Sequence, residues 1–230
     1  MKVLEFAIPF NNEIDLIIGA GVLLYAVHDQ RIYFLLGQET NDYRFGVFGG
    51  RIKPGVGIVD TAINEFEEET LGAVMPRSDL ARILHSRLYT LKFVGAAGLN
   101  RYFVTFMVRI PFDPHICTVF ANTRSGMIQG RLRDTIPGCV DHVTNQLKYD
   151  YLEKRELRWF LSEDIFNIAL RSRWNRPVTG IAGSPMFRRP FLSGLHAVIQ
   201  YFNMDKFFRD LVWCDPRVKS STTTPIKNTT

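Results

Sequence analysis

Two hydrophobic runs near the start of the chain are separated by a short polar break. Residues 16–28 and 31–37 are mostly apolar, with Asp29 and Gln30 between them. Apolar runs joined by a two-residue polar break are typical of a β-hairpin. The longer run, of about a dozen residues with two glycines, is too short to cross a bilayer as a helix. We therefore expect a buried hairpin and no membrane anchor.

Further apolar segments extend the predicted sheet. Residues 44–50 follow a polar connector at 38–43, and residues 81–94 and 101–110 contain alternating or continuous apolar positions. Such patterns favour strands, and the glycine-rich residues 95–98 favour a turn between the last two. The hairpin and these strands together predict a mixed sheet that helices must cover.

A glycine-rich turn leads into the most acidic segment of the chain, residues 49–72, with the sequence GGRIKPGVGIVDTAINEFEEETLG. Its proline and glycines supply turn chemistry before a helix, and we expect Asp60 to cap the helix start. Ala62, Ile63 and Phe66 recur at helical spacing and form one apolar side. The helix is therefore predicted to pack on the sheet through that side.

Three glutamates of this helix share one face. Glu65, Glu68 and Glu69 have i, i+3, i+4 spacing, whereas Glu67 falls off that face. Like charges so close together weaken a helix unless protons or a cation compensate them, and oxygen ligands are those that Mg²⁺ and Mn²⁺ prefer. The face is thus a candidate metal site, and the alternative is an acidic helix face in contact with water.

The same stretch resembles the box of the Nudix hydrolase superfamily. That box runs Gly, five residues, Glu, seven residues, and then Arg-Glu-hydrophobe-any-Glu-Glu-any-Gly. Counted from Gly50, its metal-binding glutamates fall in step at Glu65, Glu68 and Glu69. The resemblance implies an α/β/α sandwich with a mixed sheet, here with a helical C-terminal extension. It also implies metal-dependent hydrolysis of a diphosphate linkage in a nucleotide-type substrate.

The box departs from the family pattern at three positions. Val56 stands where the family has Glu, Asn64 where it has Arg, and Leu71 is an extra residue before Gly72. In the family this Glu and Arg support each other and orient the metal-binding carboxylates, so losing only one would leave a charge unpaired. Because both are neutral here, one hypothesis is an active enzyme whose supporting pair has been replaced. The other is a catalytically weak box that binds a nucleotide or RNA.

The resemblance also assigns a backbone ligand. Metal ligation would come from the carbonyl of Gly49 and from Glu65, Glu68 and Glu69, with Mg²⁺ or Mn²⁺ as the cofactor. A residue without a side chain suits close approach of the backbone to an ion. The EETLG sequence that closes the box resembles Nudix-like proteins of large DNA viruses.

A further glutamate is implied by residues 149–160, which regain apolar character and end in an aromatic pair. This segment resembles a late Nudix strand in which a glutamate from the preceding loop projects toward the metal. Glu153 fits that position, as an additional ligand or as the general base, and Glu156 is the alternative. Among the box glutamates, Glu68 and Glu69 are the other candidates for the catalytic base.

The next candidates are arginines in a segment rich in turn residues. Residues 111–145 are predicted to be irregular, and irregular segments of that length are often functional. In Nudix-like proteins the substrate is often selected outside the box, so Arg124, Arg131 and Arg133 are candidates for phosphate contacts. Solvated loop arginines are the alternative.

Basic residues are concentrated in the C-terminal part of the chain. Residues 1–153 carry 15 Lys and Arg against 17 Asp and Glu, whereas residues 154–230 carry 13 against 6. Such asymmetry favours a polyanionic partner. That partner would be a phosphate-rich small molecule, such as a nucleoside diphosphate derivative, or capped RNA; an ordinary basic surface is the alternative. The sequence assigns no oligomeric state.

The C-terminal region is predicted to be helical and then disordered. Residues 162–171, 191–201 and 205–213 have helical patterns. The polar residues 218–230 are typical of a disordered tail. We expect residues 1–217 to form one domain that includes the helical extension.

Cysteine usage and the N-terminus bear on localisation. Cys117, Cys139 and Cys214 are odd in number and widely spaced, which favours neither a disulfide framework nor a zinc site. The first residues lack the basic and apolar regions of a signal peptide. We expect a cytoplasmic protein, in the host cytoplasm if it is viral.

Overall fold

The computed structural model describes residues 4–5, 17–98, 101–132, 136, 138–141, 144, 146–171 and 187–201. Its strands are β1 (Leu4–Glu5), β2 (Ile17–His28), β3 (Arg31–Glu39), β4 (Phe45–Gly46), β5 (Phe48–Arg51), β6 (Leu91–Gly98), β7 (Arg101–Arg109) and β8 (Lys154–Leu161). Within the described residues these form one sheet in the order β1-β6-β7-β2-β3-β4, with β5 paired to β2 and β8 paired to β3. The β1–β6 and β2–β7 pairs are parallel and β2–β3 is antiparallel, so the sheet is mixed, as predicted.

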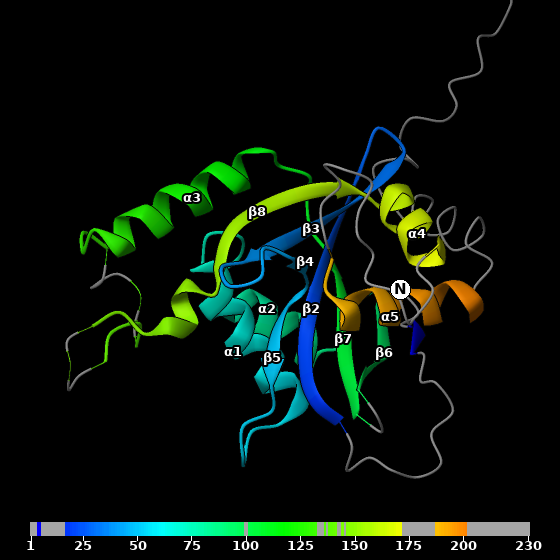
Figure 1. Cartoon of the computed structure of the whole chain (residues 1–230), viewed down its shortest axis with the longest axis horizontal. Helices are drawn as coiled ribbons and strands as arrows, with labels where there is room; N and C mark the ends of the chain where they lie inside the picture. The colour runs from blue at the N-terminus through cyan, green and yellow to red at the C-terminus, as the bar shows by residue number, and fades with distance from the viewer. Residues whose placement is uncertain are drawn as a thin grey trace, which may run out of the picture.

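Helices pack on both faces of this sheet (Figure 1). Alternate residues of β2 point to opposite faces: Leu24 belongs to one buried cluster, and Leu23 and Tyr25 belong to another. The first cluster includes residues of α1, α2 and α3, and the second includes residues of α4 and α5. The predicted sandwich of helices around a mixed sheet is therefore confirmed. The helices are α1 (Ile58–Thr70), α2 (Arg77–His85), α3 (His115–Ile128), the 3₁₀-helix η3 (Tyr149–Leu152), α4 (Ser162–Arg171) and α5 (Arg189–Tyr201).

The predicted hairpin is formed by β2 and β3. The two strands pair in antiparallel register up to His28 and Arg31. Asp29 and Gln30 have positive φ angles of 47° and 60°, and a two-residue type I′ turn requires positive φ at both of its central residues. The strand β3 runs on to Glu39, two residues beyond the predicted end, and this extension brings Glu39 into the sheet.

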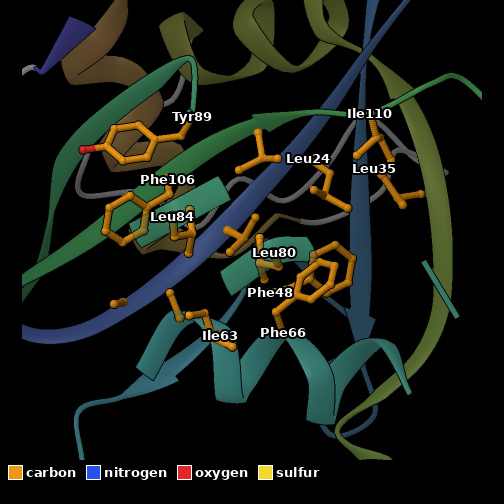
Figure 2. Close-up of a cluster of buried hydrophobic side chains, with 14 of the residues drawn as sticks. Leu24, Leu35, Phe48, Ile63, Phe66, Leu80, Leu84, Tyr89, Phe106 and Ile110 are labelled. Carbon is orange, nitrogen blue, oxygen red and sulfur yellow. The ribbon is translucent and has the colours of Figure 1, made fainter. Parts of the chain in front are cut away.

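The apolar side of α1 anchors that helix on the sheet. Ala62, Ile63 and Phe66 are all buried, as predicted. Phe66 is fully buried, and its ring packs edge to face on Phe48 of β5 at a centroid distance of 5.6 Å. Figure 2 shows Phe66 and Ile63 of α1 beside Leu80 of α2, beneath side chains of the sheet. Packing thus holds α1 directly beside the β5 strand.

Three predicted segments differ from the structure. Residues 81–85 belong to α2, not to a strand, because Leu80 and Leu84 lie one helical turn apart and are both buried. A short apolar run does not distinguish helix from strand by itself. Residues 95–98, predicted as a turn, belong to β6. Residues 111–145 are not irregular throughout, since α3 buries Phe120 and Met127.

The C-terminal helices agree with the prediction where they are described. Residues 162–171 form α4, and α5 covers the predicted helix at 191–201. Residues 205–213 and 218–230 lie outside the described part of the chain, as does Cys214, while Cys117 is half-buried and Cys139 is buried. Among the described helices, none has the length and apolarity needed to cross a membrane.

Candidate active site

The acidic helix α1 begins without a side-chain cap. Its N-cap is Gly57, whose carbonyl accepts a 2.8 Å hydrogen bond from the Thr61 amide. The prediction that Asp60 caps the helix is therefore wrong: Asp60 lies inside the first turn. An acidic side chain there still interacts favourably with the helix dipole.

The extra residue of the box ends the helix. Leu71 is the C-cap and has a left-handed φ of 56°, and Gly72 follows with a φ of 66°. Leu71 is nevertheless buried, with 4% of its surface exposed, so its packing offsets a conformation that costs a non-glycine residue about 1–2 kcal/mol. The insertion is thus absorbed after the three glutamates and leaves their spacing intact.

Two polar side chains of α1 face the next helix. Arg77 of α2 donates hydrogen bonds to Glu67 Oε2 at 2.7 Å and to Asn64 Oδ1 at 2.6 Å. These contacts place Glu67 and Asn64 in an exposed bridge between α1 and α2. Asn64, at the position where the box has Arg, is therefore held by a different partner.

Glu65 and Glu68 are half-buried on another side of α1. The pKa of Glu65 is raised to about 7, chiefly by burial and also by the charges of Glu68 and Glu153, against the opposing effect of Lys53. Burial also raises the pKa of Glu68. A Cβ at Gly50 would collide with Glu65 Oε2, so the box turn lies directly against this carboxylate.

Glu69 is the most buried of the three box glutamates, with 2% of its surface exposed. Its Oε2 accepts a 2.7 Å hydrogen bond from the Gly49 amide, and its Oε1 lies 2.9 Å from Lys154 Nζ in an ion pair. Burial raises its pKa to about 8, although Lys154 lowers it. Beyond this ion pair, no hydrogen bond to Oε1 is found among the described residues.

Two more carboxylates lie beside Glu69. One oxygen each of Glu39, Glu69 and Glu153 can be chosen so that all three lie within 4.8 Å of one another. Oxygen donors at such spacing suit a hard divalent ion; of the box glutamates, Glu69 belongs to this described group, and Lys154 Nζ pairs with two of the group's members, Glu39 and Glu69. Glu153 directly precedes β8, and its backbone carbonyl accepts a 2.7 Å hydrogen bond from the Thr40 amide.

Burial raises the pKa of Glu153, with a further contribution from Glu39. Glu156, the alternative to Glu153, lies within β8 and accepts hydrogen bonds from Arg158. The structure thus brings Glu153, and not Glu156, to the buried acidic cluster.

Sequence reasoning missed Glu39 and its two cationic partners. Lys154 Nζ contacts Glu39 Oε1, and Arg188 donates a 2.8 Å hydrogen bond to the same oxygen. Burial alone would lower the pKa of Lys154, but the charges of Glu69 and Glu39 raise it. No local motif marks these three residues, because they meet only through strand pairing and the approach to α5.

The predicted phosphate-binding arginines take different positions. Arg124 of α3 donates a 2.8 Å hydrogen bond from Nε to the Lys154 carbonyl, and burial together with Arg155 lowers its pKa. It therefore ties α3 to the start of β8. Arg131 is exposed in the turn after α3, and Arg133 lies outside the described residues.

A cavity of about 240 Å³ borders the box turn. Gly49 and Gly50 line it, so the same two residues touch both the cavity and the box carboxylates. The other lining residues include two arginines and two phenylalanines, Arg51, Arg188, Phe103 and Phe191.

Solved structures of Nudix proteins are similar to this chain, whereas no family model and no curated protein matches the sequence. The NUDIX domain of Shewanella oneidensis NrtR, complexed with ADP ribose, has 12% identity and a TM-score of 0.40, with coverage of 84% of this chain and 95% of that one. The Nudix hydrolase RenU of M. smegmatis has 13% identity and a TM-score of 0.41, with coverage of 80% and 84%. The C. elegans Ap4A hydrolase has 15% identity and a TM-score of 0.34, with coverage of 66% and 86%. At these TM-scores the similarities carry no argument about function, which is drawn from the site itself.

Proposed function

We propose that this chain is a divalent-metal-dependent hydrolase that cleaves a diphosphate linkage in a nucleotide-type substrate. The observation that carries the proposal is that Glu65 and Glu69 of α1 both repel Glu153 of the turn before β8, and that oxygens of Glu69, Glu153 and Glu39 lie within 4.8 Å of one another. Burial and repulsion from neighbouring carboxylates raise the pKa of the three box glutamates and of Glu153, against the opposing effect of Lys53 and Lys154. Perturbed carboxyl groups at one place mark a candidate functional site.

The proposed metal ligands are Glu65, Glu68, Glu69 and the carbonyl of Gly49. The amide of Gly49 points to Glu69, not to the paired strand β2. Since the N–H and C=O of one residue in an antiparallel strand face the same edge, the Gly49 carbonyl also points away from β2. When bound there, Mg²⁺ or Mn²⁺ would neutralise phosphate charge and lower the pKa of water.

Glu153 is our candidate for the general base. Its half-buried carboxyl group has a raised pKa, which suits a group that must accept a proton near neutral pH. Glu69 is held from both sides by Gly49 and Lys154, so its role is better described as a fixed ligand than as a proton acceptor. Glu68, half-buried on α1, is the second candidate for the base.

The cavity beside Gly49 and Gly50 supports a phosphate-bearing substrate. The guanidinium groups of Arg51 and Arg188 can hold phosphate charge, and the ring of Phe103 offers a stacking surface for a base. Its volume of about 240 Å³ lies below the roughly 300–1,000 Å³ of cavities that enclose whole ligands. We therefore expect one part of the substrate to enter the cavity. Both a nucleoside diphosphate derivative and the cap of an RNA have a part of suitable size.

The proposal is tested by incubating the protein with a panel of diphosphate compounds and with capped RNA, each with Mg²⁺ and with Mn²⁺. We expect metal-dependent product formation that a Glu68→Gln, Glu69→Gln double variant abolishes. The matched control is Glu67→Gln, because Glu67 contacts Arg77 and not the acidic cluster. Turnover that survives the double variant would refute the metal mechanism. Binding without turnover in the parent would favour the alternative, a nucleotide or RNA binding module.

A further inference from the structure

Lys154 is the only lysine or arginine that is fully buried in the described part of the chain. A buried ammonium group is costly unless it is closely paired, and Lys154 has two carboxylate partners, Glu39 and Glu69. The fold also makes room for its stem. A Cβ at Gly37 would lie 2.8 Å from Lys154 Cδ and 3.1 Å from Cε, so a side chain at position 37 would displace the lysine stem.

An irregularity in the pairing of β3 with β8 places the Lys154 side chain beside Glu39. Along β3 and β8 the partners are Gln38 with Glu156 and then Glu39 with Lys154, so that β8 has one extra residue, Arg155, between the two pairs. Such a bulge re-aims the side chains on either side of it. The bulge leaves Lys154 opposite Glu39. Gly37 lies two residues before Glu39 in β3, so its side of the strand is the same as that of Glu39.

The lysine and the box turn hold Glu69 from two sides. Lys154 Nζ lies 2.9 Å from Oε1, and the Gly49 amide donates to Oε2. Glu39 in turn holds the lysine and is itself bound by Arg188. The carboxylate of Glu69 is thus fixed between β5 and β8 by charged and hydrogen-bonding partners that are themselves fixed.

The supporting pair of the box cannot supply this function. Val56 has an apolar side chain, and only its amide is engaged, with the Lys53 carbonyl at 3.0 Å. Asn64 is bound by Arg77 on the outer surface. We infer that Lys154, backed by Glu39, is the positioning residue that orients Glu69 for metal binding in place of that pair. The inference rests on the proposed metal-dependent function.

The direction in which one substitution changes the metal affinity distinguishes this positioning role from a simple charge effect. If Lys154 acted only as a nearby positive charge, it would repel a divalent ion, and its removal would tighten binding. If it positions Glu69, its removal weakens binding. Lys154→Met removes the charge and keeps much of the stem, so that the two roles predict opposite results.

The first measurement is the affinity for Mn²⁺, which is determined from the electron paramagnetic resonance signal of the free ion. We expect Lys154→Met to bind Mn²⁺ about 10–100-fold more weakly than the parent, as when an outer partner of a metal ligand is lost. Circular dichroism verifies that the variant is folded. Affinity that is unchanged or tighter in the folded variant overturns the inference.

The second measurement needs no metal. In EDTA, exchange of the Gly49 amide proton is followed by NMR, because a loosened Glu69 carboxylate would no longer protect it. We expect faster exchange in Lys154→Met than in the parent, and unchanged exchange overturns the inference. If the parent binds no Mn²⁺, the proposed function fails, whereas the exchange of Gly49 still decides whether Lys154 positions Glu69.

Gly37→Ala is the second variant, for the case in which Lys154→Met does not fold. It changes no charge and displaces the lysine stem. We expect it to weaken Mn²⁺ binding and to speed the exchange of the Gly49 amide in the same direction as Lys154→Met. A folded Gly37→Ala protein that matches the parent in both measurements overturns the inference. Gly57→Ala is the glycine control, since a Cβ there meets only Asp60 Oδ2, at 3.4 Å.

Discussion

The amide of Gly49 and the carboxylate of Glu69 are joined by a buried hydrogen bond of 2.7 Å, although 20 positions separate the two residues in the chain. The bond connects β5 to the last turn of α1. Next to it, Gly50 lies directly against the Glu65 carboxylate. The turn and the helix therefore form one unit in which a change in either part moves the carboxylates.

Loss of one half-buried box carboxylate should abolish most of the activity. We expect Glu68→Gln to lower kcat/KM with Mn²⁺ by at least about 100-fold, the upper end of what the loss of an outer partner of a metal site costs. Glu67→Gln should stay close to the parent, because Glu67 binds Arg77. Steady-state kinetics of both variants provide the test, and equal activity of the two would contradict the assignment.

A methyl group on the box turn should disturb the site without unfolding the protein. Gly50→Ala places a Cβ against Glu65 Oε2, so the carboxylate must move. We expect Mn²⁺ affinity to fall by about 10–100-fold, while Gly57→Ala, with room for a Cβ, keeps the parent's affinity. Calorimetric titration with Mn²⁺ checks this, and the prediction fails if the two alanine variants bind alike.

The stability of the metal-free protein should fall as the pH rises. The pKa of Glu65 is raised to about 7 from its ordinary value of 4.5, chiefly by burial. Between these two values the folded chain holds a proton that the unfolded chain has lost, so raising the pH destabilises the folded state. Mn²⁺ binds the deprotonated form, and its stabilising effect should therefore grow as the pH rises through about 7.

Thermal unfolding in EDTA and in Mn²⁺, from about pH 5 to about pH 8, measures both trends. The Glu65→Gln variant should show a flatter dependence in EDTA, because Glu65 no longer titrates. A metal-free protein whose Tm rises across this range would contradict the prediction.

The anchor of α1 should contribute strongly to stability. Phe66 is fully buried and packs on Phe48, so Phe66→Ala should lower the free energy of unfolding by about 3–5 kcal/mol. Leu170→Ala is the control, since Leu170 is 55% exposed and surface changes are usually within about 0.5 kcal/mol. Urea unfolding followed by circular dichroism compares the two, and similar losses would argue against α1 being anchored through Phe66.

Local pattern predicted the helix that carries the carboxylates and the hairpin beside it. The spacing of Ala62, Ile63 and Phe66 determines which side of α1 is buried, and the two polar residues after His28 determine the turn. Both depend on residues within a few positions of one another, where helical and strand periodicities act directly. The same logic failed at residues 81–85, where a run too short to show a period became part of α2.

Tertiary structure alone decided the partners of Glu69. Lys154 and Glu39 are 115 positions apart and meet because β3 pairs with β8 across a bulge, and strand register at that separation leaves no mark on either local sequence. Arg188 joins them from a position further still along the chain. By itself the sequence determined three carboxylates on one helix face. The pairing of distant strands determined that one of them is held by a buried lysine, because a charge is buried only where the fold supplies its counter-charge.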